Sequence, residues 1–243
     1  MRLEREVWKT QNGKDFAIGV VKFDSVDVAR ALDIVKKKID HVNVHSPAGI
    51  KRNNEVIESR LLAGKLADHA VEYLINKCII KKNLPFIVQE YDSVRCDDFI
   101  SPDPYDILVY GNNMRYEVEV RSSFCYRLRD KESILDKLSC YGFYTSKTKG
   151  YEPLKDYYWQ VVFHNVPRDI SNAGDGLNVV RVFEDDVRNK CLEAYIVGGG
   201  PRSIFLSDQS EVRKDQDGAF YQSIYPISNG FDCDMLLRHM MFK

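Results

Sequence analysis

Alternation of apolar and charged residues is clearest over residues 115–121. The apolar members are Tyr116, Val118 and Val120, and the charged members are Arg115, Glu117, Glu119 and Arg121. A period of two is typical of a strand with one buried face. The run "YDILVY" precedes this segment, and the polar turn "GNNM" separates the two. The pattern therefore predicts an antiparallel hairpin that carries a charged face.

Helical periodicity is strongest over residues 54–77, where Asn54 can cap the helix and apolar residues form a stripe. Lys65 and Asp68 are expected on its other faces, and Gly64 would allow close packing of another element. A second helix is expected after Ser25, its predicted N-cap. Further strands are expected at 16–24, 86–91, 156–166 and 177–183, and further helices at 131–145, 184–196 and 234–243.

This order of elements predicts an α/β (α+β) fold with a mixed central sheet flanked by helices. No internal repeat, low-complexity segment or linker interrupts the 243 residues, so we expect a single domain over 1–243.

Composition narrows the class of protein. Hydrophobic residues make up 44% and charged residues 29% of the chain, as in globular proteins. No apolar run approaches the roughly 20 residues that cross a bilayer, and the first residues lack the apolar core of a secretory signal. The six cysteines form no CxxC pair, which favours reduced thiols. We therefore expect an intracellular, cytoplasmic protein.

Acidic residues on both strands of the hairpin suggest a cation site. Asp106 stands at the entry to the first strand, and Glu119 lies on the second. Mg²⁺ prefers hard oxygen ligands and binds through one or two carboxylates together with substrate phosphate. The carbonyl of Val120 could add a ligand, and Arg121, two residues after Glu119, could reach the same point. Such a site can hydrolyse a phosphodiester.

These residues resemble the signature of the PD-(D/E)xK nuclease superfamily. Asp106 matches the aspartate of that signature, and Glu119-Val120-Arg121 matches its Glu-x-Lys, with arginine in place of lysine. The resemblance covers about residues 54–165 and implies a restriction-endonuclease-like core. The segments 1–45 and 170–243 would be elaborations that carry specificity.

The resemblance implies a divalent-metal-dependent DNA endonuclease, a restriction or other defence nuclease that can act as a homodimer. Mg²⁺ (or Mn²⁺) would be held by Asp106, Glu119 and the Val120 carbonyl. Arg121 would steady the phosphate or the attacking water. Glu58 on the preceding helix would support the metal, with Glu55 and Glu72 as alternatives.

Three alternatives stay open from the sequence. Glu117 and Glu119 form a Glu-x-Glu pattern, in which Glu117 would bind the metal and Glu119 would orient water. Arginine stays protonated and cannot act as a base, so Arg121 could instead mark an inactive nuclease-fold protein that binds DNA or assembles with partners. The charged strand face could also be a solvated surface with cross-strand ion pairs.

A basic and aromatic run follows the second strand. Its members with a predicted role in DNA binding are Tyr126, Arg127, Arg129 and Lys131. The cations would contact phosphates and the tyrosine would stack on a base. The other interpretation is an exposed helix start with scattered charge. The net charge of −1 argues against a protein coated in basic surface, but a local basic cleft is compatible with it.

Overall fold

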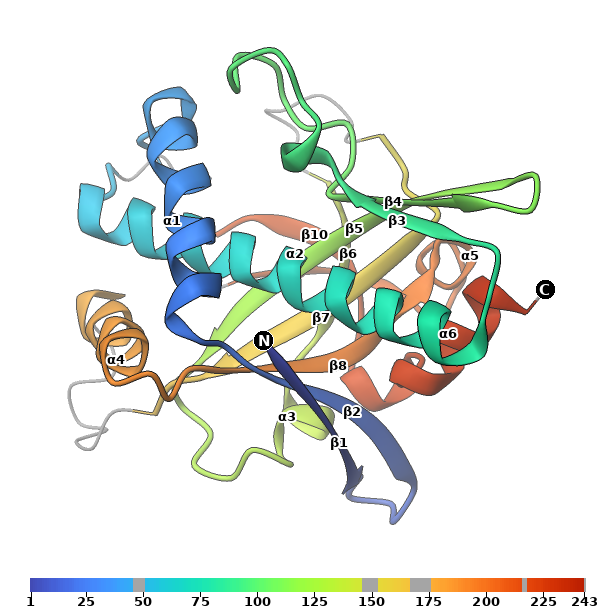
Figure 1. The fold of residues 1–243 in the computed structure, drawn as a ribbon. Coiled ribbons are helices and arrows are strands. Elements are labelled where there is room, and N and C mark those ends of the chain that lie inside the picture. The colour runs from blue at the N-terminus through green and yellow to red at the C-terminus, as the bar shows by residue number, and fades with distance from the viewer. Residues whose placement is uncertain (46–50, 146–152, 167–175, 216–217, 243) are drawn as a thin grey trace.

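A mixed seven-stranded sheet forms the centre of the computed structural model (Figure 1), which describes residues 1–45, 51–145, 153–166, 176–215 and 218–242. The strand order is β1-β2-β8-β7-β5-β4-β3, and a small second sheet has the order β6-β10-β9. The strands of the large sheet are β1 (Arg2–Lys9), β2 (Asp15–Lys22), β3 (Ile87–Glu90), β4 (Ile107–Gly111), β5 (Met114–Cys125), β7 (Tyr157–His164) and β8 (Glu193–Pro201). Those of the small sheet are β6 (Cys140–Tyr144), β9 (Glu211–Lys214) and β10 (Phe220–Ile224). The expectation of an α/β fold with a mixed central sheet is confirmed.

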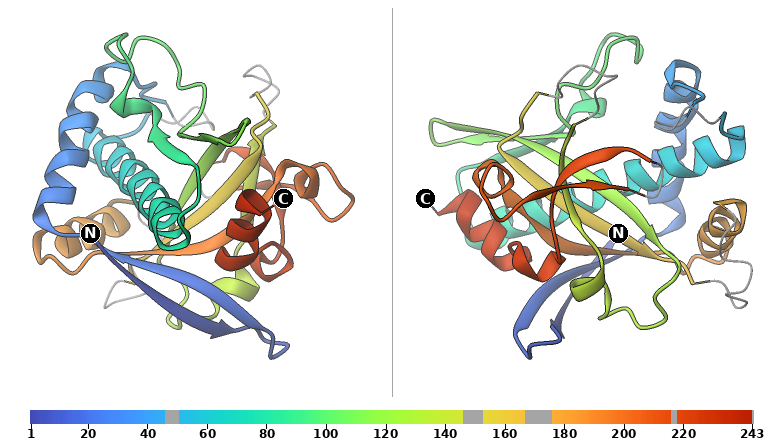
Figure 2. Two further views of the ribbon diagram at one scale, coloured as in Figure 1. Left: turned by 45° about the vertical axis from the view of Figure 1, so that its right-hand side comes forward. Right: turned by 180° about the vertical axis from the view of Figure 1, so that it is seen from behind.

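Helices cover one face of the large sheet and the small sheet covers the other (Figures 1 and 2). The helices are α1 (Ser25–Lys38), α2 (Asn54–Lys82), α3 (Ile134–Lys137), α4 (Gly176–Arg188), α5 (Arg202–Phe205) and α6 (Cys233–Met241). One hydrophobic core lies between the sheet and α1, α2, α4 and α6. A second core lies on the opposite face, under the small sheet, α3 and α5. Burial on both faces accounts for the continuous apolar runs of β7 and β8.

The hairpin of β4 and β5 forms as the alternation predicts. Val118 and Val120 are buried in the helix-side core. The turn residues Asn112 and Asn113 adopt φ of 50° and 61°. Asparagine tolerates this left-handed conformation, which a two-residue hairpin turn requires.

The two neighbours of β5 pair with different parts of it. β4 pairs antiparallel only from Met114 to Val118, whereas β7 pairs parallel from Val118 to Cys125. The chain enters β4 at Asp106, so beyond Val118 the two strands part. The part of β5 that begins at Glu119 therefore lies where this fork opens.

Helix α2 lies across the helix-covered face of the sheet (Figure 1). Asn53, rather than Asn54, caps it, with its side chain accepting a hydrogen bond from the Glu55 amide. Likewise Asp24, rather than Ser25, caps α1. A Cβ built on Gly64 would have no neighbour within 4 Å in the described residues, so this glycine does not mark a close approach.

Three predicted elements in the second half of the chain differ from the structure. Residues 131–145 form only the short α3, followed by strand β6, because β-sheet pairing of the aromatic stretch with β10 overrides its helical pattern. Residues 177–183 belong to helix α4 rather than to a strand. There Val180 and Phe183 are buried three residues apart, a helical period that the β-branched residues obscured. The predicted helix 184–196 continues α4 only to Arg188, and its end forms β8.

Segments predicted as terminal elaborations belong to the same sheet as residues 54–165, the predicted core. β2 from residues 1–45 pairs with β8 from residues 170–243, and β8 pairs with β7. The chain ends therefore extend the central sheet. In the described part of the chain, no helix combines the length and apolarity needed to span a membrane.

Candidate active site

A cavity of about 160 Å³ lies at the fork between β4 and β5, and we call it the carboxylate cavity. Asp106, Glu119 and Val120 line it from the hairpin side. Helix α2 contributes Arg60, Leu61, Gly64, Lys65 and Asp68, and α1 contributes Ile34, Val35 and Lys38. The two acidic residues singled out from the sequence therefore lie on the same cavity, although they come from different strands.

Backbone hydrogen bonds fix Asp106 against β5. Its amide donates to the Val118 carbonyl at 3.1 Å, and its Oδ2 accepts from the Val120 amide at 2.7 Å. In an extended strand the N–H and C=O of one residue point to the same edge. Because the Val120 amide points to Asp106, the Val120 carbonyl also faces the open side of the fork.

The carboxyl of Asp106 is hard to ionise without a cation. Burial raises its pKa to about 8, and the nearby Asp68 carboxylate adds to the rise. The hydrogen bond from Val120 and the charges of Lys65 and Arg121 only partly oppose this. A group of this kind gains most from a divalent cation placed beside it.

Glu119 and Arg121 lie side by side, as expected for residues two apart on a strand. Arg121 Nη1 is 3.1 Å from Glu119 Oε1, and the two side chains are 17% and 13% exposed. Arg121 Nε donates to the Gly142 carbonyl at 3.1 Å, and its guanidinium lies 5.0 Å from the centre of the Tyr221 ring. The small sheet therefore holds the guanidinium at the fork.

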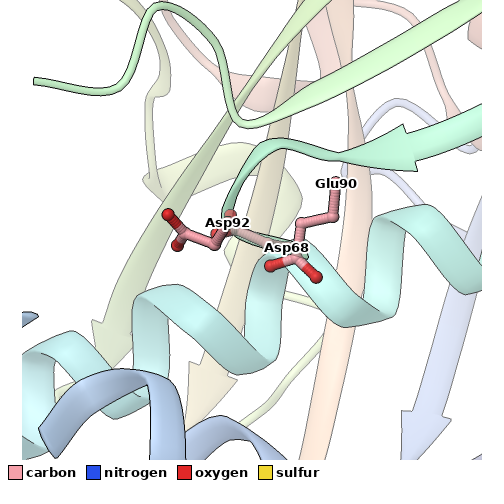
Figure 3. A group of neighbouring side chains, drawn as sticks. All are labelled: Asp68, Glu90 and Asp92. Carbon is pink, nitrogen blue, oxygen red and sulfur yellow. The ribbon is translucent and has the colours of Figure 1, made fainter. Parts of the chain in front are cut away.

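Lys65 occupies the centre of a buried acidic cluster formed by Asp68, Glu90 and Asp92. One oxygen from each of the three carboxylates lies within 4.8 Å of the others (Figure 3), a spacing that a metal ion could use. However, Lys65 Nζ lies 2.8 Å from Asp68 and 2.7 Å from Glu90, and it also contacts Asp92. The ammonium of Lys65 therefore occupies the space between the three carboxylates, and Lys38 and Arg95 also contact Asp92.

Lys65 and the three carboxylates of Asp68, Glu90 and Asp92 are called the lysine cluster below. The same contacts account for the pKa values of its members. Burial lowers the pKa of Lys65, but the three carboxylates outweigh it and hold that pKa well above its usual value. Burial raises the pKa of Glu90, yet His69 and Lys65 bring it below its ordinary value. His69 Nε2 lies 3.1 Å from Glu90 Oε2. Asp68 differs, because burial raises its pKa to about 7.

Glu117 and Glu58 do not line the carboxylate cavity. Glu117 lies opposite Leu108 in the paired part of the hairpin, with Arg115 at 3.2 Å and Lys155 at 3.9 Å. Glu58 is an exposed residue of α2. The geometry therefore favours the alignment of the signature with Glu119 and Arg121 over the alignment with Glu117 and Glu119. Helix α2 contributes Asp68, rather than Glu58, as the acidic residue of the cavity.

The basic run after β5 forms a loop. Arg127 and Arg129 are exposed, and Arg127 stacks over Tyr126 at 5.2 Å. Lys131 is bound to Glu6 at 2.9 Å and lies 5.5 Å from the Trp8 ring. None of these four residues lines the carboxylate cavity. Their predicted role in DNA binding stays a prediction.

Lys65, Asp68 and Arg60 of α2 were not singled out as site residues from the sequence. Lys65 and Asp68 were expected on other faces of the helix, but they are only 5% and 6% exposed. A signal was present, because Lys65, Asp68 and His69 have the i, i+3, i+4 spacing of one helix face within an apolar stretch. Charged residues are rarely buried unless paired, so such a group indicates an ion-pair cluster or a site.

Comparison with known proteins gives one sequence relative. The chain is 29% identical over 233 residues to an uncharacterized protein, MJECS01, of Methanocaldococcus jannaschii, covering 89% of this chain and 83% of the relative. No protein-family model matches the chain, and no solved structure matches it.

Proposed function

We propose that the protein is a divalent-metal-dependent deoxyribonuclease with a restriction-endonuclease-like core. The observation that carries this proposal is the position of Asp106 and Glu119 on one cavity, at the fork where β4 and β5 part. A carboxylate from each strand and a backbone carbonyl form a set of hard oxygen donors. We favour a role as a restriction nuclease or another defence nuclease.

The residues of the cavity fit a magnesium or manganese ion. Asp106, Glu119 and the carbonyl of Val120 would hold it, since all three offer oxygen and none offers sulfur or nitrogen. The raised pKa of Asp106 reflects buried negative charge that a dication would offset. When bound, such an ion activates water and offsets charge on the phosphoryl oxygens.

The protein's own residues would orient the phosphate. Arg121 presents a guanidinium that is positioned by Glu119 and Gly142, and its planar donors suit a phosphate. Arg121 cannot accept a proton from water, because guanidinium stays protonated. Its role would therefore be to bind and orient a phosphate that lies beside Glu119, its ion-pair partner. Val35 and Leu61 contribute apolar surface to the lining of the carboxylate cavity.

A cleavage assay tests the proposal. The protein is incubated with supercoiled plasmid and with linear single-stranded and duplex DNA, in Mg²⁺, Mn²⁺ or EDTA. We expect metal-dependent nicking that falls at least about 100-fold in Asp106→Asn and in Glu119→Gln, because each loses a charged ligand. The matched control is Glu117→Gln, two residues away on the same strand, which should keep most of the activity.

A second candidate is a nuclease-fold protein that binds DNA without cutting it. It is favoured by Arg121, which stands in the lysine position of the signature and already pairs with Glu119. Binding of DNA with no cleavage of any substrate in either metal would support this candidate. Cleavage that survives both Asp106→Asn and Glu119→Gln would refute the proposed active site itself.

A further inference from the structure

A second cavity, of about 210 Å³, adjoins the carboxylate cavity, and we call it the arginine cavity. It lies between the first part of α2, the second half of β5 and the small sheet. Three arginines line it, together with serines, two tyrosines and one acidic residue: Arg52, Arg60, Arg121, Ser122, Ser123, Tyr141, Tyr221 and Asp215. Its lining is dominated by hydrogen-bond donors.

Positive charge in the arginine cavity exceeds the negative charge that lines it. Among the described residues of the lining, Asp215 is acidic and three residues carry guanidinium groups, of which Arg121 is paired with Glu119 outside the cavity. Burial lowers the pKa of Arg60, and the like charge of Arg52 adds to this effect. Two arginines close enough to repel each other are stabilised by an anion between them.

Arg52 supplies an independent indication of a ligand. Its Nη2 donates to the Asn43 carbonyl at 2.6 Å, which fixes the guanidinium. Its Nε is buried and has no hydrogen-bond partner among the described residues. A buried donor without a partner is unfavourable, because it has lost its hydrogen bonds to water without replacing them. An anion in the cavity could remove that cost.

The two cavities are adjacent along β5 and share a wall. Glu119 and Val120 line the carboxylate cavity, whereas Arg121 to Phe124 line the arginine cavity, and Arg60 lines both. From Glu119 to Ser122 the strand advances three residues, or about 10 Å at about 3.3 Å per residue, which approximates the distance between the two cavities along β5. Phosphates of one DNA strand in a duplex follow one another at about 3.4 Å along the helix axis, so this span corresponds to a phosphate about three nucleotides away.

We propose that the arginine cavity binds a second phosphate of the DNA strand whose scissile phosphate lies in the carboxylate cavity. The position relative to the cut rests on the proposed nuclease function, whereas phosphate binding at Arg52 and Arg60 can be tested without cleavage. Guanidinium forks give paired, charge-assisted hydrogen bonds to phosphate oxygens. The hydroxyl of Tyr141, whose pKa burial raises to about 12, stays protonated and is a further donor.

The test measures DNA affinity in EDTA, so that no cleavage occurs. Fluorescence anisotropy with an oligonucleotide of about 20 nucleotides is recorded over a range of salt for the wild type, Arg52→Gln and Arg60→Lys. We expect affinity to fall about tenfold and the salt dependence to decrease by about one ion for Arg52→Gln. Arg60→Lys keeps the charge but loses the fork, so it should lose affinity with little change in salt dependence.

The control is Arg2→Gln, an arginine that is 73% exposed on β1 and should bind DNA as the wild type does. Circular dichroism spectra and melting temperatures verify that the variants fold. A circular single strand and linear strands with or without a 5′- or 3′-phosphate form the second arm. Equal binding of the circle assigns the cavity to an internal phosphodiester, and preference for a phosphorylated end assigns it to a terminal phosphate.

The outcomes separate this proposal from the nuclease proposal. If folded Arg52→Gln and Arg60→Lys both bind as the wild type does, the phosphate site is refuted, even if the wild type cuts DNA. If the wild type cuts no DNA in either metal but both variants lose affinity, the nuclease function fails and the phosphate site stands.

Discussion

Two groups of carboxylates lie within the same part of the molecule, but they are neutralised in different ways. In the lysine cluster, Lys65 contacts all three acidic side chains, and the pKa values of Glu90 and Asp92 are lowered. At the fork, Asp106 is held by a backbone amide, and its pKa is raised to about 8. Proximity of acidic groups is therefore a poor indicator of a metal site unless the surrounding cations are considered.

The comparison assigns different roles to the two groups. The lysine cluster joins α2 to the end of β3 and is a structural contact that already contains its cation. At the fork, Arg121 pairs with Glu119, whereas the carboxyl of Asp106 accepts a hydrogen bond from a backbone amide and keeps a raised pKa, so we propose that an added cation binds there. The predictions that follow test this distinction, from the largest expected effect to the smallest.

Replacement of Lys65 should produce the largest loss of stability. Lys65→Met leaves three carboxylates close together without their ammonium, and breaking a buried ion pair in this way costs about 3–5 kcal/mol. Urea unfolding at pH 8 measures the loss. The control Lys81→Met, an exposed lysine in the last turn of the same helix, should change stability by less than about 0.5 kcal/mol. Equal effects of the two substitutions would contradict a structural role for the cluster.

Metal binding should depend on the fork and not on the lysine cluster. Mg²⁺ at about 100 times its dissociation constant should stabilise the wild type by about 2.7 kcal/mol, seen as a higher melting temperature. We expect Asp106→Asn and Glu119→Gln to lose this increase. Glu90→Gln should keep it, relative to its own metal-free melting temperature. An increase that is lost only in Glu90→Gln would place the metal in the lysine cluster.

The pH dependence of stability should reveal the raised pKa of Asp106 in the metal-free protein. The folded state holds the proton up to a pH of about 8, whereas the unfolded chain releases it near pH 4. The folded state binds more protons in this window, so the stabilising contribution is complete below about pH 4 and is lost as the pH rises to 8. Asp106→Asn should therefore be more stable than the wild type at pH 8.5 by at least about 1 kcal/mol.

At pH 4 the same pair should differ little, because Asp106 is then protonated in both states. Denaturant unfolding in EDTA at both pH values measures the two differences. A constant difference across this range would show that burial does not raise the pKa of Asp106.

The smallest expected effect concerns Gly64, which lines the carboxylate cavity from α2. A methyl group there has open space within 4 Å, so Gly64→Ala should stabilise the helix by about 0.5–1 kcal/mol. Thermal unfolding measures this gain. Gly64→Leu would extend into the cavity and should reduce metal binding while the fold is retained, and Ile80→Leu, at an exposed position of the same helix, is the matched control. Unchanged metal binding in Gly64→Leu would indicate that the cavity is not the metal site.

The sequence predicted the positions of the candidate site residues on β5, but it did not predict those on α2. Alternation along 115–121 set the hairpin register and therefore placed Glu119 and Arg121 on one face. Asp106 was singled out by its position at the entry to the first strand, and the resemblance to a known signature supported that choice. Lys65 and Asp68 were misplaced because α2 is buried on more than one side, so the apolar stripe does not define its inner face. The contact of Arg121 with β6 and β10 depends on long-range pairing, and the sequence predicted a helix where β6 lies.

Helix α2 contributes residues to both cavities. Arg60, Gly64 and Asp68 follow one another every four residues, so they form a single row along the helix, with about 6 Å of axis between neighbours. The distance between Arg60, which lines both cavities, and Asp68, which lines the carboxylate cavity, is therefore maintained by consecutive turns of hydrogen-bonded backbone. A ligand that contacts both Arg60 and Asp68 would therefore meet a constant distance between these two residues for as long as the helical turns remain intact.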